Sequence, residues 1–314
     1  MGGLQAAMEY GLLISGGVEN YIRKIRILKD RIDNCDAIFI GAGGGISNAA
    51  GKDDKTRFRK FFPDFIDKYH VEDIFSGGYY PFETSGEYWA WWSRAIWEYR
   101  YEDRTNELYE KLLKILDGKN YFIMTTNVDH EFVKNGFDKE RLFYMDGDYG
   151  TFRCSEPCKE ITYDNLDMVI EMMKAQGFVL DEDGRMNVPP DGRISMDVPK
   201  DLQPKCPECG RPMAVNISGR KFVYDNGWFV GEAQKNDFLL NNRSSHILCL
   251  ELGAGIYTKD RIRHPLWDIV MQNMNATYAA VNFGETSCPE YIKDRSILID
   301  ADIKNVINDL VGIG

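Results

Sequence analysis

Residues 37–48 read AIFIGAGGGISN, a short apolar run that passes directly into a cluster of glycines. The run is too short for a helix and fits a buried strand of a parallel sheet, and glycines after it allow the backbone to approach a ligand closely. We interpret residues 41–45 as a phosphate cradle, followed by a helix that begins near Ser47 or Asn48. An ordinary tight turn between strand and helix is the alternative, because Ile46 stands where a strict G-x-G-x-x-G fingerprint needs its third glycine.

Several later segments repeat this order of strand and helix. Helices are expected at 19–34, 105–117, 264–274 and 302–311, and apolar strand-like runs occupy 121–129, 141–148, 247–255, 278–285 and 296–300. The repetition predicts an α/β fold with a Rossmann-like, doubly wound parallel sheet. Ligands bind at the carboxyl ends of strands in such sheets, so we expect four polar or glycine-rich strand ends to face one ligand: 41–45, 126–129, 253–255 and 282–285.

Two segments of different composition interrupt the predicted sheet. Residues 51–104 combine charges with many aromatic side chains and predict a helical insertion. Its aromatics form either the insertion's own core or a lid over a ligand. Residues 150–225 contain two cysteine pairs and predict a zinc-binding module. The Rossmann-like domain would then comprise residues 1–50, 105–149 and 226–314.

The cysteine pairs fit a structural metal site. Cys154 is followed by Cys158, and Cys206 by Cys209 in a typical zinc knuckle. Four thiolates hold zinc tetrahedrally and leave no open position for chemistry, so we expect one structural zinc per chain. A reduced thiol cluster without metal is the alternative. We expect a cytoplasmic protein, and in a reducing compartment the two cysteine pairs indicate metal and the other three of the seven cysteines indicate buried apolar side chains.

Composition argues against two classes of partner. The chain of 314 residues has 38 basic and 49 acidic residues, a net charge of −11, and no block of Lys or Arg. We therefore expect no general nucleic-acid or membrane binding. No apolar run approaches the roughly 18 residues of a membrane span. The segment before residue 10 lacks the basic start of a signal peptide, and Ala6 breaks the myristoylation pattern.

Taken together and in order, these parts resemble the sirtuin family over nearly the whole chain. The resemblance implies an NAD-binding protein with the dinucleotide between a large Rossmann domain and a small zinc domain. It matches Ala42 and Gly43 to the phosphate loop, Ile46 to the wall of the nicotinamide pocket, and Asn127 and Asp129 to the residues that hold nicotinamide and its ribose. The expected NAD-binding residues are Gly41, Ala42, Gly43, Ile46, Asn127, Asp129, Gly253, Ala254, Asn282 and Phe283, with Asn282 at the adenosine ribose.

The chain departs from sirtuin deacylases at the catalytic histidine. Those enzymes have His-Gly before the first zinc cysteines, whereas this chain has Asp146-Gly147 and no histidine before any glycine. The family's Pro-Asp-Phe-Arg segment is replaced by GKDDKTRFR at 51–59, and its Gly-Thr-Ser loop by Gly-Ala-Gly at 253–255.

These features resemble the macrodomain-linked class M branch, whose members usually have Gln where Asp146 stands. This resemblance implies a protein ADP-ribosyltransferase that acts on a lipoylated carrier similar to the glycine-cleavage H protein. It also implies a macrodomain hydrolase as a functional partner.

The expected catalytic residues are Asn127, Asp129 and Asp146. Asn127 would orient the nicotinamide carboxamide, Asp129 would hold the ribose or carboxamide, and Asp146 would stabilise positive charge at C1′, as carboxylates of glycosidases do. An Asp, with a reference pKa of about 3.9, is a poor base at neutral pH, so deacylation should be weak or absent. The structural alternatives are a helix N-cap for Asp129 and a loop cap for Asp146. His130 is expected on a helix surface.

Three other functions stay open at this stage. They are a weak NAD-dependent deacylase, an NAD glycohydrolase, and a protein that binds NAD or ADP-ribose without turnover.

Overall fold

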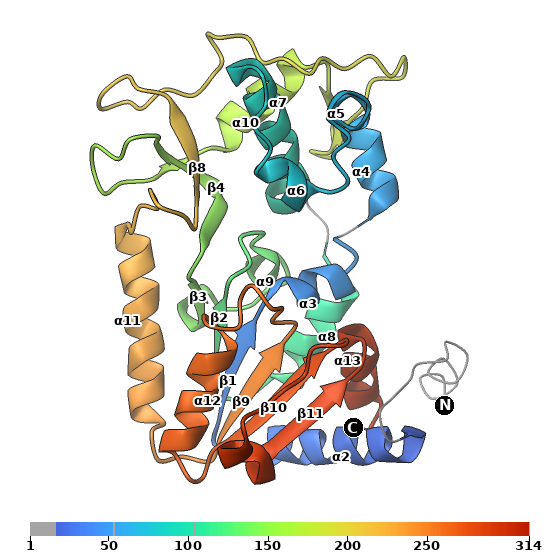
Figure 1. Ribbon diagram of the computed structural model, residues 1–314, viewed down its shortest axis with the longest axis vertical. Helices are drawn as coiled ribbons and strands as arrows, with labels where there is room; N and C mark the ends of the chain where they lie inside the picture. Colours follow the sequence, from blue (N-terminus) through green and yellow to red (C-terminus); the bar gives the residue numbers. More distant parts are fainter. Residues whose placement is uncertain (1–16, 53, 103–104, 314) are drawn as a thin grey trace.

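A six-stranded parallel sheet forms the centre of the large lobe in the computed structural model, which describes residues 17–52, 54–102 and 105–313 (Figure 1). The strand order is β11-β10-β9-β1-β2-β3, and neighbouring strands pair in parallel. The predicted doubly wound sheet is confirmed. Its strands are β1 Ala37–Ala42, β2 Tyr121–Thr125, β3 Leu142–Tyr144, β9 Ile247–Leu252, β10 Thr277–Asn282 and β11 Ser296–Asp300.

Helices cover both faces of this sheet because its strands are apolar on both sides. Side chains of Ile38 and Ile40 in β1 pack with helices α2, α8 and α13, whereas Phe39 points to the opposite face, which α11 and α12 cover. The predicted helices are confirmed to within three residues at each end. They are α2 Gly17–Asn34, α8 Glu107–Ile115, α12 Arg263–Gln272 and α13 Ile303–Gly312, and α11 covers Asn226–Asn241.

One predicted strand is divided between two sheets. Residues 141–148 were expected to form a single strand, but β3 ends at Tyr144 and β4, Gly147–Cys154, begins an antiparallel sheet with the order β5-β4-β8. Gly147 has a φ of +94°, which glycine adopts readily where the chain turns. The proposed boundary at 149/150 therefore falls inside β4, and the division into domains stays a proposal.

The helical insertion and the cysteine module together form the small lobe, at the top of Figure 1. Its helices are α4 Lys55–Phe61, α5 Pro63–Tyr69, α6 Ile74–Gly78, α7 Ser85–Ile96 and α10 Leu166–Ala175, with a π-helical turn at Trp97–Tyr101. Its remaining strands are β5 Tyr163–Asp164, β6 Val179–Leu180, β7 Met186–Asn187 and β8 Met213–Ile217. Short helices α3 Gly44–Ala49 and α9 Glu131–Lys134, and 3-10 turns at Lys139–Arg141 and Glu290–Arg295, complete the large lobe.

The aromatic side chains of the insertion are mostly core residues. Trp91 is fully buried, and its ring lies 4.6 Å from that of Phe62 and 5.1 Å from that of Phe65, measured between centroids. The same apolar cluster includes Phe152 of β4 and Met172 of α10. The aromatics are therefore core residues, but the core is shared with the cysteine module instead of being the insertion's own.

The predictions about the first residues, that they form no signal peptide or myristoylation site, lie outside the described residues. Within the described ranges, no helix combines the length and apolar character needed to cross a membrane.

Two glycine-rich turns touch at the carboxyl edge of the sheet. The N–H of Gly43 donates to the carbonyl of Leu252 at 3.0 Å, and that of Gly45 to the carbonyl of Gly253 at 2.9 Å. A Cβ on Gly43 would lie 2.6 Å from the Gly253 oxygen, and Gly253 itself has a φ of +66°. The contact therefore requires glycine on both sides.

A buried ion pair supports the turns that follow β9 and β10. Glu251, in the middle of the sheet, is fully buried and accepts from the Arg263 guanidinium at 2.8 Å and from the Tyr278 hydroxyl at 2.5 Å. Arg263 also donates to the carbonyls of Ala254 at 2.9 Å and Glu285 at 2.7 Å. One guanidinium thus joins the two turns to each other and to the sheet.

We expect Gly43→Ala to destabilise the fold. The added methyl would meet the backbone of the 253–254 turn, which cannot rotate away as a side chain can, and overpacking of this kind costs about 2 kcal/mol. Gly44→Ala is the matched control, because a Cβ on Gly44 meets nothing within 4 Å. Urea unfolding compares the two variants with the wild type, and equal stability of both would show that the turns do not need this approach.

We expect Glu251→Gln to lower the free energy of unfolding by about 3 kcal/mol, because it leaves the buried Arg263 cation without its counter-charge. Glu290→Gln is the control: Glu290 pairs with Lys293, but both side chains are largely exposed, so its loss should cost little. Thermal and urea unfolding measure both. Equal losses would contradict the structural role of the buried pair.

Candidate functional site

The predicted site residues lie at the carboxyl ends of five adjacent strands. In sheet order these are β10 with Asn282, β9 with Gly253, β1 with Gly43, β2 with Asn127 and β3 with Asp146. The chain proceeds from β1 toward β2 and β3 on one side and later places β9, β10 and β11 on the other. Such a reversal of strand order is where open α/β sheets bind ligands.

Asn127, Ser47 and Asp129 form a buried hydrogen-bonded group. The amide of Asn127 donates to the Gly43 carbonyl at 3.1 Å and to the Ser47 hydroxyl at 3.0 Å, and Ser47 donates to Asp129 Oδ2 at 2.6 Å. All three side chains are buried. They come from β1–α3 and from the end of β2, so this contact fixes the two strand ends against each other.

Asp129 accepts a hydrogen bond at the start of α9, and its surroundings shift its pKa. Its Oδ1 accepts from the Glu131 N–H at 3.1 Å at the start of α9, but the N-cap residue of this helix is His130 and not, as the structural alternative had it, Asp129. Burial raises the pKa of Asp129, and the nearby Glu131 carboxylate raises it further, while Ser47 opposes the shift. The surroundings therefore favour the protonated form more than water does.

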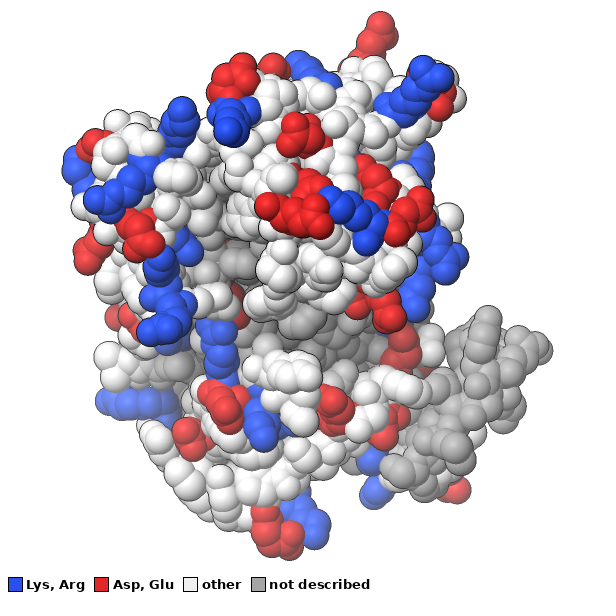
Figure 2. Space-filling model, turned by 45° about the horizontal axis from the view of Figure 1, so that its top comes forward, with Lys and Arg blue, Asp and Glu red and all other residues white. Residues whose placement is uncertain are grey.

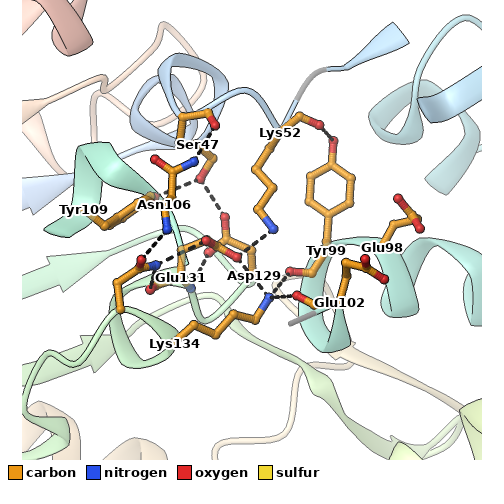
Figure 3. A network of polar contacts seen from close by, with 12 residues as sticks. Ser47, Lys52, Glu98, Tyr99, Glu102, Asn106, Tyr109, Asp129, Glu131 and Lys134 are labelled. Carbon is orange, nitrogen blue, oxygen red and sulfur yellow. Dashed lines mark hydrogen bonds and ion pairs between the residues drawn. The ribbon is translucent and has the colours of Figure 1, made fainter. Parts of the chain in front are cut away.

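A charged network surrounds Asp129 on the side of the small lobe (Figure 3). Glu131 Oε1 lies 2.6 Å from Lys52 Nζ and 2.9 Å from Lys134 Nζ. Lys134 also donates to the carbonyl of Tyr99 at 3.0 Å, and the Tyr99 hydroxyl donates to the carbonyl of Lys52. The network links Lys52 and Tyr99, near the two ends of the helical insertion, to α9.

The glycine cradle is more tightly closed than the sequence predicted. The helix after β1 begins at Gly44 rather than near Ser47, and the N–H groups of Gly43 and Gly45 already donate to the β9 turn. Gly41 and Ala42 lie within β1, where a Cβ on Gly41 would meet Ile262 at 2.6 Å, and Ile46 is fully buried. The glycines thus serve the close contact between turns, and phosphate binding stays a prediction.

The turns after β9 and β10 also face each other. The Asn282 amide donates to the Ala254 carbonyl at 3.2 Å, and Ala254 is buried beneath it. Phe283 is 67% exposed, so its ring is accessible to a ligand. The structure brings Gly253, Ala254, Asn282 and Phe283 together, as the prediction of one dinucleotide-binding edge requires.

Asp146 is paired with an arginine. Its two carboxylate oxygens accept from the two terminal nitrogens of Arg261, one at 2.7 Å and the other in an equally direct contact. The carboxylate was expected either to stabilise positive charge at C1′ or to cap a loop, and its Arg261 partner is a finding of the structure. Arg261 lies in the turn between β9 and α12, far from Asp146 in the sequence.

The prediction for His130 is wrong. His130 precedes α9 with a φ of +61° instead of lying on the helix surface, and its Nδ1 is 2.8 Å from Asp148 Oδ2. Burial would raise the pKa of Asp148, but the contacts with His130 and Arg100 outweigh it and lower the pKa to about 2. The carboxylate therefore stays ionised and holds the imidazole beside the Tyr144 ring, with 4.6 Å between ring centroids.

The four predicted zinc ligands come together. The Sγ atoms of Cys154, Cys158, Cys206 and Cys209 lie within 4.8 Å of one another, and two pairs are 3.6 Å apart. A tetrahedron with zinc–sulfur bonds of about 2.3 Å has sulfur–sulfur edges of about 3.8 Å. The cluster therefore has the geometry and the donor set of a structural zinc site.

Sequence reasoning missed Ser47, Arg261, Arg263 and the Glu131 network. A polar residue inside an apolar strand was available as a signal, because Glu251 interrupts ILCLEL and needs a buried partner. Nothing in the local sequence pairs Arg261 with Asp146, since the two are 115 residues apart.

The face drawn in Figure 2 is hollowed between the two lobes, and both acidic and basic side chains are exposed on it. The strand ends described above border the region between the lobes (Figure 1).

Comparisons with known proteins agree with this arrangement. The chain is 31% identical over 288 residues to a protein ADP-ribosyltransferase of Staphylococcus aureus, covering 91% of this chain and 86% of that protein. It is 26% identical over 263 residues to a probable bifunctional ADP-ribose hydrolase/ADP-ribosyltransferase of Fusarium oxysporum f. sp. cubense, of which it spans only 40%. No family model matches the sequence.

Among solved structures the fold is similar to that of Sir2 proteins. Sir2Tm bound to a propionylated peptide superposes with a TM-score of 0.53 at 16% identity, covering 93% of this chain and 98% of that one. A mutant Sir2 homologue in complex with ADP-ribose gives 0.53 at 14% identity, covering 91% and 95%. These likenesses show the fold, and the sequence relation shows the family: the chain belongs with the staphylococcal protein to the protein ADP-ribosyltransferases built on the sirtuin fold.

Proposed function

We propose that this protein is a sirtuin-type, NAD-dependent protein ADP-ribosyltransferase. It breaks the bond between nicotinamide and ribose and transfers ADP-ribose to a protein acceptor. The observation that supports this most directly is the convergence of the five strand ends of β10, β9, β1, β2 and β3 on one edge, in a chain related over most of its length to a protein ADP-ribosyltransferase. NAD acts as a co-substrate.

The residues at this edge have the functional groups that such a reaction needs. The Asn127 amide offers a donor and an acceptor to a carboxamide, provided it exchanges its bond to Ser47 or Gly43 for the ligand. Asp129, buried beside it, would hold the ribose or the carboxamide. A dry site strengthens these contacts and orients the bond that breaks.

Departure of neutral nicotinamide leaves positive charge at C1′. The acceptor's nucleophile then forms a new bond to C1′ and loses its proton to water. A deacylase needs in addition a base for a ribose hydroxyl, usually a histidine. The residue at the corresponding position, Asp146, is bound by Arg261 through both oxygens and is poorly suited to take a proton. This contact supports transfer over deacylation.

We further propose a lipoylated carrier, similar to the glycine-cleavage H protein, as acceptor and a macrodomain hydrolase as functional partner. The resemblance to class M sirtuins supports both, and the name of the Fusarium relative combines ADP-ribose hydrolase with transferase. We propose the cytoplasm as the compartment, consistent with cysteines that are all unbridged in the described structure.

The direct test of the proposed function uses labelled NAD and a lipoylated carrier protein. The wild type should release nicotinamide and label the carrier, and Asn127→Ala should reduce both by on the order of 100-fold, because it removes a preorganised donor. Asn275→Ala, an exposed asparagine in the turn before β10, should leave both rates unchanged.

Other outcomes separate the alternatives. Nicotinamide release without labelling of the carrier would indicate a glycohydrolase. Nicotinamide release that requires an acyl-lysine peptide and matches the formation of O-acyl-ADP-ribose would indicate a deacylase. Binding of NAD without release would indicate a sensor. Each of these results would contradict the proposed transfer.

We also propose that the four cysteines hold one structural zinc. The ion would crosslink the end of β4 and the turn after it to the turn before β8, and thereby support β4, which begins next to Asp146.

Metal analysis of the purified protein should give about one zinc per chain, and Cys206→Ala should lose it and lower the thermal midpoint. Cys249→Ala, a buried cysteine of the sheet far from the cluster in sequence, should retain the zinc. Protein without zinc whose small lobe is nevertheless folded would contradict the assignment.

A further inference from the structure

The contact between Asp146 and Arg261 joins the loops after β3 and β9, which flank the two central strand ends at which the reaction is proposed. Asp146 follows β3 and Arg261 follows β9, and β1 and β2 lie between these strands in the sheet. Adjacent strands are about 4.8 Å apart, so the two origins are separated by about 14 Å along the edge. The pair therefore connects the loop after β3 to the loop after β9, and in the sheet these strands flank β1 and β2, whose ends carry Gly43 and Asn127.

Both partners are held by their neighbours independently of the pair. Next to Arg261, Ile262 is fully buried and Arg263 is fixed by Glu251. The carbonyl of Asp146 accepts from the Ser218 N–H at 2.9 Å, and that of Met145 from the Trp228 indole at 3.1 Å. The ion pair is therefore not needed to place either backbone, and what it determines is the orientation of the Asp146 carboxylate.

Burial and geometry distinguish this pair from an ordinary surface contact. The Asp146 side chain is 10% exposed and that of Arg261 37%, and the two groups meet through two parallel hydrogen bonds. A bidentate guanidinium fixes the plane of a carboxylate, which a single ammonium cannot do. The carboxylate keeps its negative charge in one place while both oxygens accept from Arg261.

We propose that Arg261 is the positioning residue of Asp146. It holds the carboxylate at the reacting end of the crevice as a fixed anion that stabilises positive charge at C1′ and does not accept a proton. This inference rests on the proposed function and adds to it a residue that directs the chemistry toward transfer. Arg261 needs no contact with the substrate for this role.

The test compares three variants in steady-state nicotinamide release with NAD and carrier. In Arg261→Met the carboxylate is free to rotate, so kcat should fall roughly 10- to 100-fold while KM for NAD stays within about twofold. Arg261→Lys should recover part of kcat, because it restores the charge without the second hydrogen bond. Arg243→Met, an exposed arginine after α11, is the control and should match the wild type.

The double variant Asp146→Arg with Arg261→Asp shows whether the ion pair positions the carboxylate or only supports the structure. It restores an ion pair and should melt like the wild type, but it places a cation at the reacting end, so kcat should stay at least as low as in Arg261→Met. Full recovery of kcat in the exchanged protein, or an unchanged kcat in Arg261→Met, would overturn the inference while leaving the transferase function intact.

A second measurement does not depend on turnover. Crystal structures of the wild type and Arg261→Met should show Asp146 in one rotamer in the former and in more than one in the latter. An identical single rotamer in both would overturn the inference. A wild type that shows the fixed rotamer but no release or transfer would instead count against the proposed function.

Discussion

The structure depends on the close approach of two backbone turns, 43–45 after β1 and 253–254 after β9. Hydrogen bonds from Gly43 and Gly45 to the β9 turn hold these loops together, and a Cβ on Gly43 or Gly45 would meet the facing backbone at 2.6 or 2.7 Å. Because β1 and β9 are neighbours at the reversal of strand order, this contact closes the middle of the carboxyl edge. The polar residues on either side are placed relative to it.

Buried charged and polar side chains then hold the loops on either side of this contact in place. On one side, Arg263 and Glu251 join the turn after β9 to the turn after β10, which contains Asn282, the residue predicted at the adenosine ribose. On the other, Ser47 links Asn127 to Asp129. Buried ion pairs are weak sources of net stability but costly to break, which suits groups that must keep one arrangement. Buried hydrogen bonds thus hold the groups at both ends of the proposed dinucleotide site.

The sequence was sufficient for the features that depend on local patterns. Short apolar runs alternating with amphipathic helices indicated the parallel sheet, and the spacing of Cys206 and Cys209 indicated a shared metal cluster with Cys154 and Cys158.

The division of residues 141–148 between β3 and β4 could not be predicted, because one apolar run looks the same whether its end continues a sheet or leaves it. The early start of α3 at Gly44 was also hidden, since glycine is a poor helix former and tertiary contacts override that preference. Pairings such as Arg261 with Asp146, or His130 with Asp148, depend on how distant loops are arranged in space and leave no periodic signal.

The most direct test of the account is a crystal structure with an NAD analogue in which a methylene replaces the ring oxygen of the nicotinamide ribose, so that the glycosidic bond stays intact. We expect the dinucleotide to lie along the carboxyl edge, with its carboxamide bonded to Asn127, the nicotinamide ribose beside Asp129 and Asp146, and the adenosine ribose at Asn282. An analogue bound in the reverse direction, or at a place away from these strand ends, would contradict the account.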